Sequence, residues 1–554
     1  MSPEEIAVQI RSAVQACVVS EDFQPIDVES FEVVVERPKD RAHGDWASNI
    51  ALQISKLVGL NPRETASHLI KILGTVEGFE KVEIAGPGFI NFTLAKGSAG
   101  NLVPVILNAG SAYGRGESLQ GQNFNIEFIS ANPTGPLHLG HTRWAAVGDA
   151  IARVLSANGA LVTREFYVND RGVQMDKFGA SVQAAALGNP IPEDGYHGQY
   201  IKELADVIVQ KHPEILNLQT DEQFLSFREH AYALQLKEQQ DVLDNFNTHF
   251  DVWTSERRLH DSGAVEKGLA VLKSHGHLFE QDGALWLRTT DFGDDKDRVL
   301  EKSNGELTYF ASDTAYYVDK RSRGFDVCIY LLGADHHGYV NRLRAVAACA
   351  GDNPDINIEL LIGQLVKMVK GGEEVRLSKR AGNIITLEDL VDEVGVDAAR
   401  YTLIRYPVDT PLVLDLDLLI QRTNDNPVYY VQYAHARIAS VLRQAEDLKI
   451  DYRNHSFESS VLVHEKENEL LNTLAQYPSI VEKAGELRQP HRIARYLEEL
   501  ANAYHKFYDG CRVLPQGEAP VDAVNIARLY VCEATKQVLA NGLDLCGVSA
   551  PERM

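Results

Sequence analysis

Cysteine is scarce in this chain and is widely spaced. The 554 residues include six cysteines, and no two of them form a Cys-x-x-Cys pair. This pattern argues against a disulfide framework and against a cysteine zinc site. Long apolar runs are also missing, and no basic segment followed by an apolar one comes after Met1. We therefore expect a reduced, cytoplasmic protein that does not enter a membrane.

Positive charge is in deficit. The chain has 54 Lys and Arg residues against 78 Asp and Glu, which gives a net charge of −24. Such a charge argues against indiscriminate binding to polyphosphate surfaces, although a local basic patch could still hold a nucleic acid. Hydrophobic residues make up 44% of the chain and charged residues 24%, as in ordinary globular proteins. The length predicts about two to four domains.

Residues 1–115 predict an N-terminal α+β domain. A helical pattern in "PEEIAVQIRSAVQA" is followed by the strand-like pieces "FEVVVERP" and "VEIAGPGFINFTL". In the second piece Gly86-Pro87-Gly88 must turn the chain. The Gly- and Ser-rich stretch "AGSAYGRGESLQGQ" that follows is typical of a linker.

Residues 116–410 predict an α/β domain with a doubly wound parallel sheet. The strand-like "FNIEFIS", "LVTREFYVND" and "DVCIYLLGADHH" alternate with helical segments, and the last is a continuous apolar run of the kind found in buried parallel strands. An acidic, mainly helical insertion over about residues 170–300 separates the two halves. Residues 411–554 contain four amphipathic helical segments, which predict an all-α bundle.

Two histidines stand at the start of a predicted helix. In "ANPTGPLHLGHTRW" a Gly/Pro-rich loop leads into His138 and His141, which share one helix face. Phosphates favour the N-terminus of a crossover helix, where imidazoles could stabilise charge developing on phosphorus. Gly140 between them would let a flat ring approach the backbone. The alternatives are half of a zinc site, for which no third ligand stands out, and a structural helix cap.

A second candidate motif, "VKGGEEVRLSKRAGN", follows a predicted buried strand. This motif predicts a short basic loop in which Lys379 could reach over a triphosphate and neutralise the leaving pyrophosphate. The alternative is a solvated surface loop.

Acidic residues inside apolar segments indicate a cationic substrate. Glu127 interrupts the strand "FNIEFIS" with no cation beside it in the sequence, and its partner could therefore be the substrate. Tyr309, Asp313 and the amide of Asn132 would complete a cage for a guanidinium group, which prefers planar bidentate acceptors. The alternative for Asp313 is helix capping.

Together these motifs resemble those of class I aminoacyl-tRNA synthetases. His138-Leu139-Gly140-His141 is similar to their His-Ile-Gly-His signature. The segment 376–380, "RLSKR", is similar to their Lys-Met-Ser-Lys-Ser loop, with Arg in place of the first Lys and of the last Ser. Lys379 is retained at the position that meets the phosphates.

Longer stretches resemble the bacterial arginyl-tRNA synthetases over nearly the whole chain. These are "EFISANPTGPLHLGH", the Tyr-x-x-x-Asp pair, "GADHHGYVNRL", and "GVDAARYTLIR", which has Ala399 where the family's Asp-Ala-Leu-Arg segment has Leu. "RAHGDWASNIAL" and "AGPGFINFTL" are similar to the family's additional N-terminal domain, which contacts the tRNA elbow.

The resemblance implies a role for each matching residue. The catalytic residues would be His138, His141, Ser378 and Lys379. ATP would contact Pro136, Leu139, Gly140, Gly333, Asp335, His336 and Leu377. Whether Asp335 or His336 meets the ribose or the substrate stays open. Arginine would contact Glu127, Ser130, Asn132, Tyr309 and Asp313. The signature segment would consist of Asn132, Pro133, Thr134, Gly135, Pro136, Leu137, His138, Leu139, Gly140 and His141.

The C-terminal helices carry aromatic and basic residues that could read RNA. Tyrosines could stack on unpaired anticodon bases, with arginines near phosphates. The candidates are Tyr430, Tyr433, Arg437, Tyr508 and Arg512. The alternative is that most of these tyrosines belong to the core of the bundle.

The implied activity is ligation of L-arginine to tRNA(Arg) through arginyl-adenylate. ATP would be a substrate accompanied by Mg²⁺, with no tightly bound cofactor and no metal held by the protein. The family usually needs bound tRNA before it activates arginine, and its members are usually monomers.

Two other classes of function stay open. One is a nucleotidyltransferase that acts on a small acid without RNA, and the other is a non-catalytic tRNA-binding paralogue. The C-terminal domain argues against the first, and intact His138, His141 and Lys379 argue against the second.

Overall fold

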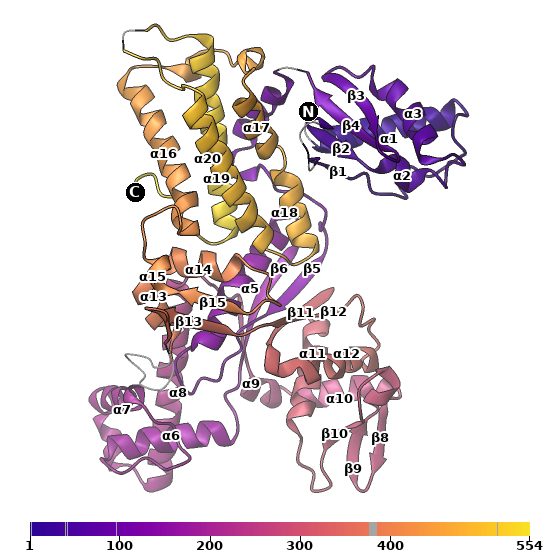
Figure 1. The fold of residues 1–554 in the computed structure, drawn as a ribbon. Coiled ribbons are helices and arrows are strands. Elements are labelled where there is room, and N and C mark those ends of the chain that lie inside the picture. The colour runs from indigo at the N-terminus through magenta and orange to yellow at the C-terminus, as the bar shows by residue number, and fades with distance from the viewer. Residues whose placement is uncertain (2, 39, 41–42, 96, 376–384, 518) are drawn as a thin grey trace.

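The N-terminal part of the protein is a separate α+β lobe. The computed structural model describes residues 1–554 except 2, 39, 41–42, 96, 376–384 and 518. Figure 1 shows the lobe beside the C-terminal helices. Its antiparallel sheet has the order β1-β2-β4-β3. The elements are α1 (Pro3–Val19), β1 (Val35–Glu36), β2 (Trp46–Ser48), α2 (Ile50–Ile54), α3 (Pro62–Leu73), β3 (Phe79–Ala85) and β4 (Phe89–Leu94).

The segment after this lobe is packed rather than loose. It contains the helix α4 (Leu102–Ala109), and Tyr113 just beyond it is buried. The Tyr113 ring stacks on Tyr477 at 6.1 Å, and its hydroxyl donates to the carbonyl of Leu474. Asn541 donates to the carbonyls of Gly110 and Tyr113. The stretch that predicted a linker is therefore attached to the C-terminal helices.

The centre of the molecule is a five-stranded, entirely parallel sheet. Its order is β12-β11-β5-β6-β7. The strands are β5 (Asn123–Glu127), β6 (Leu161–Val168), β7 (Val252–Ser255), β11 (Val327–Gly333) and β12 (Ile358–Gly363), and the helices between them include α5 (Leu139–Ala157), α11 (Tyr309–Ser322) and α12 (Val340–Cys349). The strand order reverses at β5, and ligands of such sheets bind beyond the carboxyl ends of strands at this point. The predicted doubly wound architecture is confirmed.

The predicted single insertion is two separate insertions. The first consists of α6 (Val173–Ala186), α7 (Gln199–Lys211) and α8 (Thr220–Asn245), after which β7 returns to the main sheet. The second contains α9 (Glu256–Asp261), α10 (Ala264–Ser274) and an antiparallel sheet of β8 (Leu278–Gln281), β9 (Ala284–Leu287) and β10 (Arg298–Glu301). The two insertions form opposite lower lobes in Figure 1. The missed signal is Asp282-Gly283, a two-residue turn with φ of +52° and +75° that joins β8 to β9.

The C-terminal part is helical, as predicted, and follows a short connecting region. That region contains β13 (Val366–Lys370), β14 (Glu373–Glu374), α13 (Leu387–Val394), α14 (Val396–Ile404), β15 (Leu412–Asp415) and α15 (Leu416–Leu419). The bundle comprises α16 (Pro427–Asp447), α17 (Glu465–Leu474), α18 (Tyr477–Glu486), α19 (His491–Gly510) and α20 (Ala523–Leu545). The stretch "VHEKENELLNTLAQYPSIVEKAGELR", the second of the four predicted helical segments, is broken into α17 and α18 because Pro478 cannot continue a helix. Within the described residues, no helix has the length and apolarity needed to cross a membrane.

One buried arginine joins the central sheet to the bundle. Arg400 of α14 is fully buried, and its guanidinium donates to the carboxylate of Asp149 on α5. Its remaining donors bind the carbonyls of Phe246, Asn247 and Cys546 and the hydroxyl of Thr248. These acceptors come from α5, from the end of the first insertion and from the end of α20. Arg400 therefore connects three parts of the chain that are far apart in the sequence.

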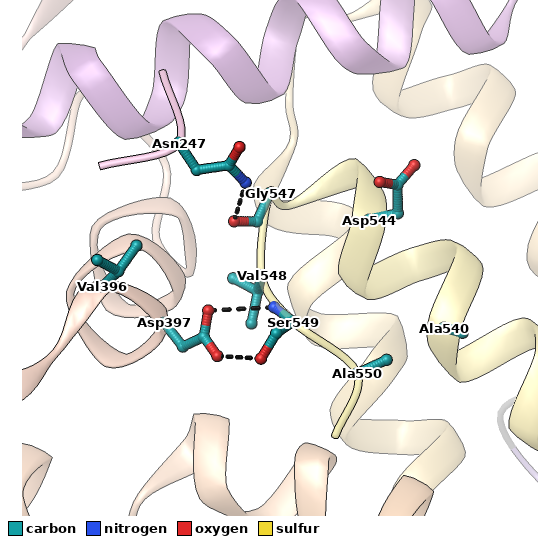
Figure 2. A pocket seen from close by; sticks show the side chains of 9 residues that line it. All are labelled: Asn247, Val396, Asp397, Ala540, Asp544, Gly547, Val548, Ser549 and Ala550. Carbon is teal, nitrogen blue, oxygen red and sulfur yellow. Dashed lines mark hydrogen bonds between the residues drawn. The ribbon is translucent and has the colours of Figure 1, made fainter. Parts of the chain in front are cut away.

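The same junction encloses a pocket of about 420 Å³. In Figure 2, Asp397 accepts hydrogen bonds from the backbone N–H and the hydroxyl of Ser549, and Asn247 donates to the carbonyl of Gly547. Asp397 and Arg400 both belong to the "DAAR" segment. This segment therefore fixes the end of the chain against the central domain.

Loss of Arg400 is expected to destabilise the whole protein. Arg400→Met leaves the carbonyls of Phe246 and Cys546 without a donor among the described residues, and it removes one of the three arginines that bind Asp149, the others being Arg153 and Arg164. It should lower the free energy of unfolding by about 3–5 kcal/mol. Urea denaturation followed by circular dichroism measures the change. Arg443→Met removes a half-exposed pair with Glu552, 3.8 Å apart, and should cost about 0–1 kcal/mol. Equal losses of unfolding free energy in the two variants would show that the contacts of Arg400 do not stabilise the junction.

Candidate active site

A large cavity opens beyond the carboxyl ends of β5, β11 and β12. Its volume is about 1180 Å³, and the start of α5 forms one wall. The sequence-predicted residues that line it are Glu127, Ser130, Asn132, His138, Gly140, His141, Asp313, Gly333 and His336. It therefore collects residues from both halves of the sheet at the position where such folds bind ligands.

The two histidines cap α5 and are held as neutral hydrogen-bond donors. Nδ1 of His138 accepts the backbone N–H of Gly140 at 3.1 Å, and Nδ1 of His141 accepts the N–H of His138 at 3.3 Å. Burial lowers the pKa of His138, and burial together with the neighbouring His138 lowers the pKa of His141 to about 3. With Nδ1 occupied as an acceptor, each neutral ring carries its proton on Nε2. Both rings, stacked at 3.8 Å, can therefore offer Nε2–H to a ligand.

Gly140 is required by the ring of His138. A Cβ at position 140 would lie 2.9 Å from Cε1 and 3.1 Å from Nδ1 of His138. A larger residue would push the imidazole out of its capping position. The predicted contact of Gly140 with adenine is an additional role that stays a prediction.

The first insertion holds the signature loop in place. The side-chain amide of Gln239, on α8, donates to the carbonyls of Asn132 and Gly135 at 3.0 and 2.8 Å. The hydroxyl of Tyr200, on α7, donates to the carbonyl of Thr134 at 3.1 Å. Sequence reasoning missed Gln239 and Tyr200 because a polar residue within an amphipathic helix carries no signal of a contact 66 or more residues away.

The signature segment is also paired with the base of the second motif. The N–H of Leu139 donates to the carbonyl of Ile385, and the N–H of Leu387 donates to the carbonyl of Leu137. The predicted residues of the second motif itself, Leu377, Ser378 and Lys379, lie outside the described residues. The chain that emerges from that motif therefore runs beside the start of α5.

Glu127 has a cationic partner within the protein, contrary to the sequence-based expectation. Its Oε2 binds the Nζ of Lys320, and its Oε1 accepts the hydroxyl of Ser130 at 2.9 Å. Lys320 comes from α11, 193 positions further along the chain. The inference that Glu127 needs a substrate cation to balance its charge was therefore wrong. Ser130 contacts Glu127 and helps to orient it.

Two buried acids have raised pKa values: Asp313, which lines the cavity, and Glu256, which is not among the lining residues. Burial raises the pKa of Asp313 to about 6, with nearby Glu127 adding to the shift and Tyr339 opposing it. Burial raises the pKa of Glu256 to about 7, and the charges of Asp313 and Asp170 add to this effect. Carboxylates whose pKa is raised in this way favour a cationic ligand. Sequence reasoning missed Glu256, which simply follows the strand β7.

The predicted partner of Asp313 does not reach the cavity. Tyr309 is the first residue of α11, 72% exposed, and it is not among the residues that line the cavity. It lies on the same helix face as Asp313, but one turn nearer the N-terminus, with its hydroxyl close to Gly172. The hydroxyl that does bind Asp313 belongs to Tyr339.

The predicted ATP contacts are only partly brought together. Gly333 and His336 line the cavity, whereas Pro136 and Leu139 do not. The side chain of Asp335 lies outside the described set. An arginine that the sequence did not single out also lines the cavity: Arg143, which is buried and donates to the carbonyls of Gln364, Pro407 and Thr410.

Four of the five candidate RNA contacts gather between α16 and α19. The guanidinium of Arg437 lies 4.2 Å from the ring centre of Tyr508 and 5.7 Å from that of Tyr433. Tyr430 and Tyr433 both pack against His505, and all four candidates are half-buried. The fifth, Arg512, is exposed in the segment after α19 and binds Gln516.

Comparison with known families covers most of the chain. The model of the arginyl tRNA synthetase N terminal domain matches residues 4–94. The model of the tRNA synthetases class I (R) catalytic domain matches residues 102–406, and that of the DALR anticodon binding domain matches residues 431–554.

Individual relatives agree with these matches. The arginine–tRNA ligases of Paenarthrobacter aurescens and Renibacterium salmoninarum are each 55% identical to this chain, over 100% of both sequences. An arginyl-tRNA synthetase structure from Campylobacter jejuni is 33% identical, with a TM-score of 0.76 over 83% of this chain and 100% of the other. The Thermus thermophilus enzyme, at 22% identity, has the same fold with a TM-score of 0.76 over 100% of both chains. The chain belongs to the arginyl-tRNA synthetase family of class I aminoacyl-tRNA synthetases.

Proposed function

We propose that the chain ligates L-arginine to tRNA(Arg) at the expense of ATP, through arginyl-adenylate. The observation that carries the proposal is the composition of the cavity. Neutral Nε2–H donors from His138 and His141 stand at the N-terminus of α5, and Glu127 and Asp313 line the same space. Donors suit a phosphate, and acids suit a cationic amino acid.

The first step is an in-line displacement at the α-phosphorus of ATP. A carboxylate oxygen of arginine forms the new O–P bond, and the bond to the β-phosphate oxygen breaks as pyrophosphate leaves. His138 and His141 donate Nε2–H to phosphate oxygens whose charge grows in the transition state. Proton transfer is unnecessary, so imidazoles that stay neutral are suited to this role. Mg²⁺ accompanies the nucleotide as a counter-ion.

The basic loop would complete this step. Lys379 would neutralise the departing pyrophosphate, and Ser378 and Leu377 would contact the nucleotide, as the resemblance implies. In the second step a hydroxyl of the terminal adenosine of the tRNA attacks the arginyl carbonyl, and AMP leaves. Gly140, with Gly333 and His336 opposite, would form the nucleotide side of the cavity.

Substrate arginine carries two cations, and the site offers acids for both. The α-ammonium and the reacting carboxylate are bonded to the same carbon, so the α-ammonium lies on the side of the histidines. Glu127 and Asn132 are on that side, because they belong to the strand and loop that lead to His138. The guanidinium then extends toward Asp313, and Glu256, which lies outside the cavity lining, acts through the electrostatic interaction between its charge and that of Asp313. A bound guanidinium would stabilise the charged forms of both acids, whose pKa burial has raised.

The remaining domains would bind the tRNA. Residues 1–115 would contact its elbow, residues 116–410 would hold the acceptor end at the cavity, and residues 411–554 would bind the anticodon through the cluster around Arg437. We expect the protein to act as a cytoplasmic monomer. RNA would complete the active site, so that arginine activation depends on tRNA.

Exchange of pyrophosphate into ATP tests the proposed function. We expect arginine-dependent exchange when tRNA is present and little without it. Labelled pyrophosphate with each amino acid, with and without tRNA, measures the reaction. Exchange without tRNA would keep the ligase assignment and remove the RNA dependence. Absence of exchange with every amino acid would favour a non-catalytic tRNA-binding protein.

His141→Ala should abolish adenylate formation and spare RNA binding. Removal of one preorganised donor should reduce kcat for exchange about 100- to 1000-fold, with tRNA affinity within about two-fold of wild type. Exchange kinetics and filter binding measure the two quantities. His249→Ala is the matched control, because His249 is 59% exposed and lies outside the cavity lining. A collapse of tRNA affinity in His141→Ala would overturn the division between catalytic and RNA-binding parts.

Arginine affinity should depend on pH. Asp313 and Glu256, with a pKa of about 6 and about 7, are protonated in acid and charged in base. Because a guanidinium binds the charged forms, KM for arginine should fall about ten-fold between about pH 5.5 and about pH 7.5, while KM for ATP changes little. Exchange assays across this range measure both constants. An Asp313→Asn variant should have weaker arginine binding and a flatter profile; an unchanged slope would exclude Asp313.

A further inference from the structure

Lys320 is a fully buried cation behind the wall of the active site. None of its side chain is exposed, and it is not among the residues that line the cavity. A buried ammonium group is costly unless charged or polar partners replace its water shell. The mechanism described above does not use Lys320, so its presence there needs a separate explanation.

The partners of Lys320 all face the substrate site. Its Nζ binds Oε2 of Glu127 and lies 4.0 Å from the ring centre of Tyr330 and 4.4 Å from that of Tyr316. Two aromatic faces and one carboxylate oxygen thus surround the ammonium. Glu127, Tyr316 and Tyr330 are themselves cavity-lining residues. Lys320 therefore contacts the wall of the cavity from behind.

The sheet explains why this position needs a cation. In the parallel pairing of β5 and β6, Glu127 and Glu165 are register partners, so two acids stand side by side. Helix α11 supplies one cation for each, Lys320 for Glu127 and Arg323 for Glu165. Burial would raise the pKa of Glu165, but Lys320 and Arg323 together hold it below its ordinary value.

The two acids are used differently. Glu165 is fully buried and accepts from Arg323, Asn125, Thr254 and Tyr316, so its oxygens are occupied within the protein. Glu127 accepts only from Lys320 and Ser130 among the described residues. A carboxylate has about four acceptor positions, so Glu127 keeps capacity on its cavity side.

We propose that Lys320 is a positioning residue for the amino-acid site. It holds the carboxylate of Glu127 in one orientation, with its remaining acceptor positions turned toward the α-ammonium of arginine. Because Lys320 balances the charge of Glu127, the guanidinium is attracted more strongly to the Asp313 end of the cavity than to Glu127. The inference rests on the proposed function, in which Glu127 binds arginine.

Kinetics of Lys320→Met test this role. We expect KM for arginine to rise about 10- to 100-fold, as when a supporting partner of a binding group is removed, with KM for ATP within about two-fold of wild type. A rise confined to KM for arginine is the signature of a positioning role, because a general loss of structure would change both constants.

Arg323→Met is the matched control. It removes the cation at the C-cap of α11, whose partner Glu165 does not line the cavity. It should lower the thermal unfolding temperature as Lys320→Met does, and leave KM for arginine within about two-fold of wild type. An equal rise in KM in both variants would show that Lys320 acts only through the stability of α11, and would overturn the proposal.

A double variant separates this inference from the proposed function. Glu127→Gln alone should raise KM for arginine, and adding Lys320→Met should change KM by less than about two-fold, because the group through which Lys320 acts is gone. The double variant also carries no unpaired charge, so it stays measurable if Lys320→Met fails to fold. A further large rise in KM would refute the positioning role and leave the ligase assignment intact. No effect of Glu127→Gln would refute the Glu127 assignment and the inference with it.

Discussion

The architecture depends on the buried ion pair between Arg400 and Asp149. A guanidinium that is removed from water must fill its donor positions, and Arg400 does so with groups from three distant parts of the chain. Asp149 lies in the middle of α5, whose first turn carries the two imidazoles. The "DAAR" segment is therefore a structural junction: its arginine connects the bundle to the helix on which the reaction centre is built.

The reaction centre uses backbone geometry to set proton positions. His138 and His141 are at once the caps of α5 and the donors that point into the cavity. Because the two backbone N–H groups occupy both Nδ1 atoms, the tautomers do not depend on a neighbouring acid. Gly140 preserves this arrangement by leaving room for the ring of His138. Three residues of one four-residue segment thus supply helix capping and proton placement, and the proposed recognition of phosphate rests on this arrangement.

The sequence predicted the elements whose signals are local. The parallel strands follow from continuous apolar runs, and the position of His138 and His141 follows from a Gly/Pro-rich loop before a helix. The partners supplied by distant elements could not be predicted. Lys320 meets Glu127 only because α11 covers β5, and Gln239 reaches the signature loop only because the first insertion folds back over it. Tyr309 shares a helix face with Asp313, but spacing alone does not tell that the first residue of this helix lies outside the cavity lining.

Helix α5 is 19 residues long, which corresponds to about 28 Å. Its N-terminus holds the imidazoles, its middle is bound to Arg400, and Asn158 at its C-cap donates to the carbonyl of Val481 on α18. A helix attached at both ends and in the middle transmits displacement as a rigid rod, so the bundle and the imidazoles must move together. The first insertion is attached differently, since it holds the signature loop through Gln239 and Tyr200. The first insertion therefore contacts the loop before α5 independently of the central junction around Arg400.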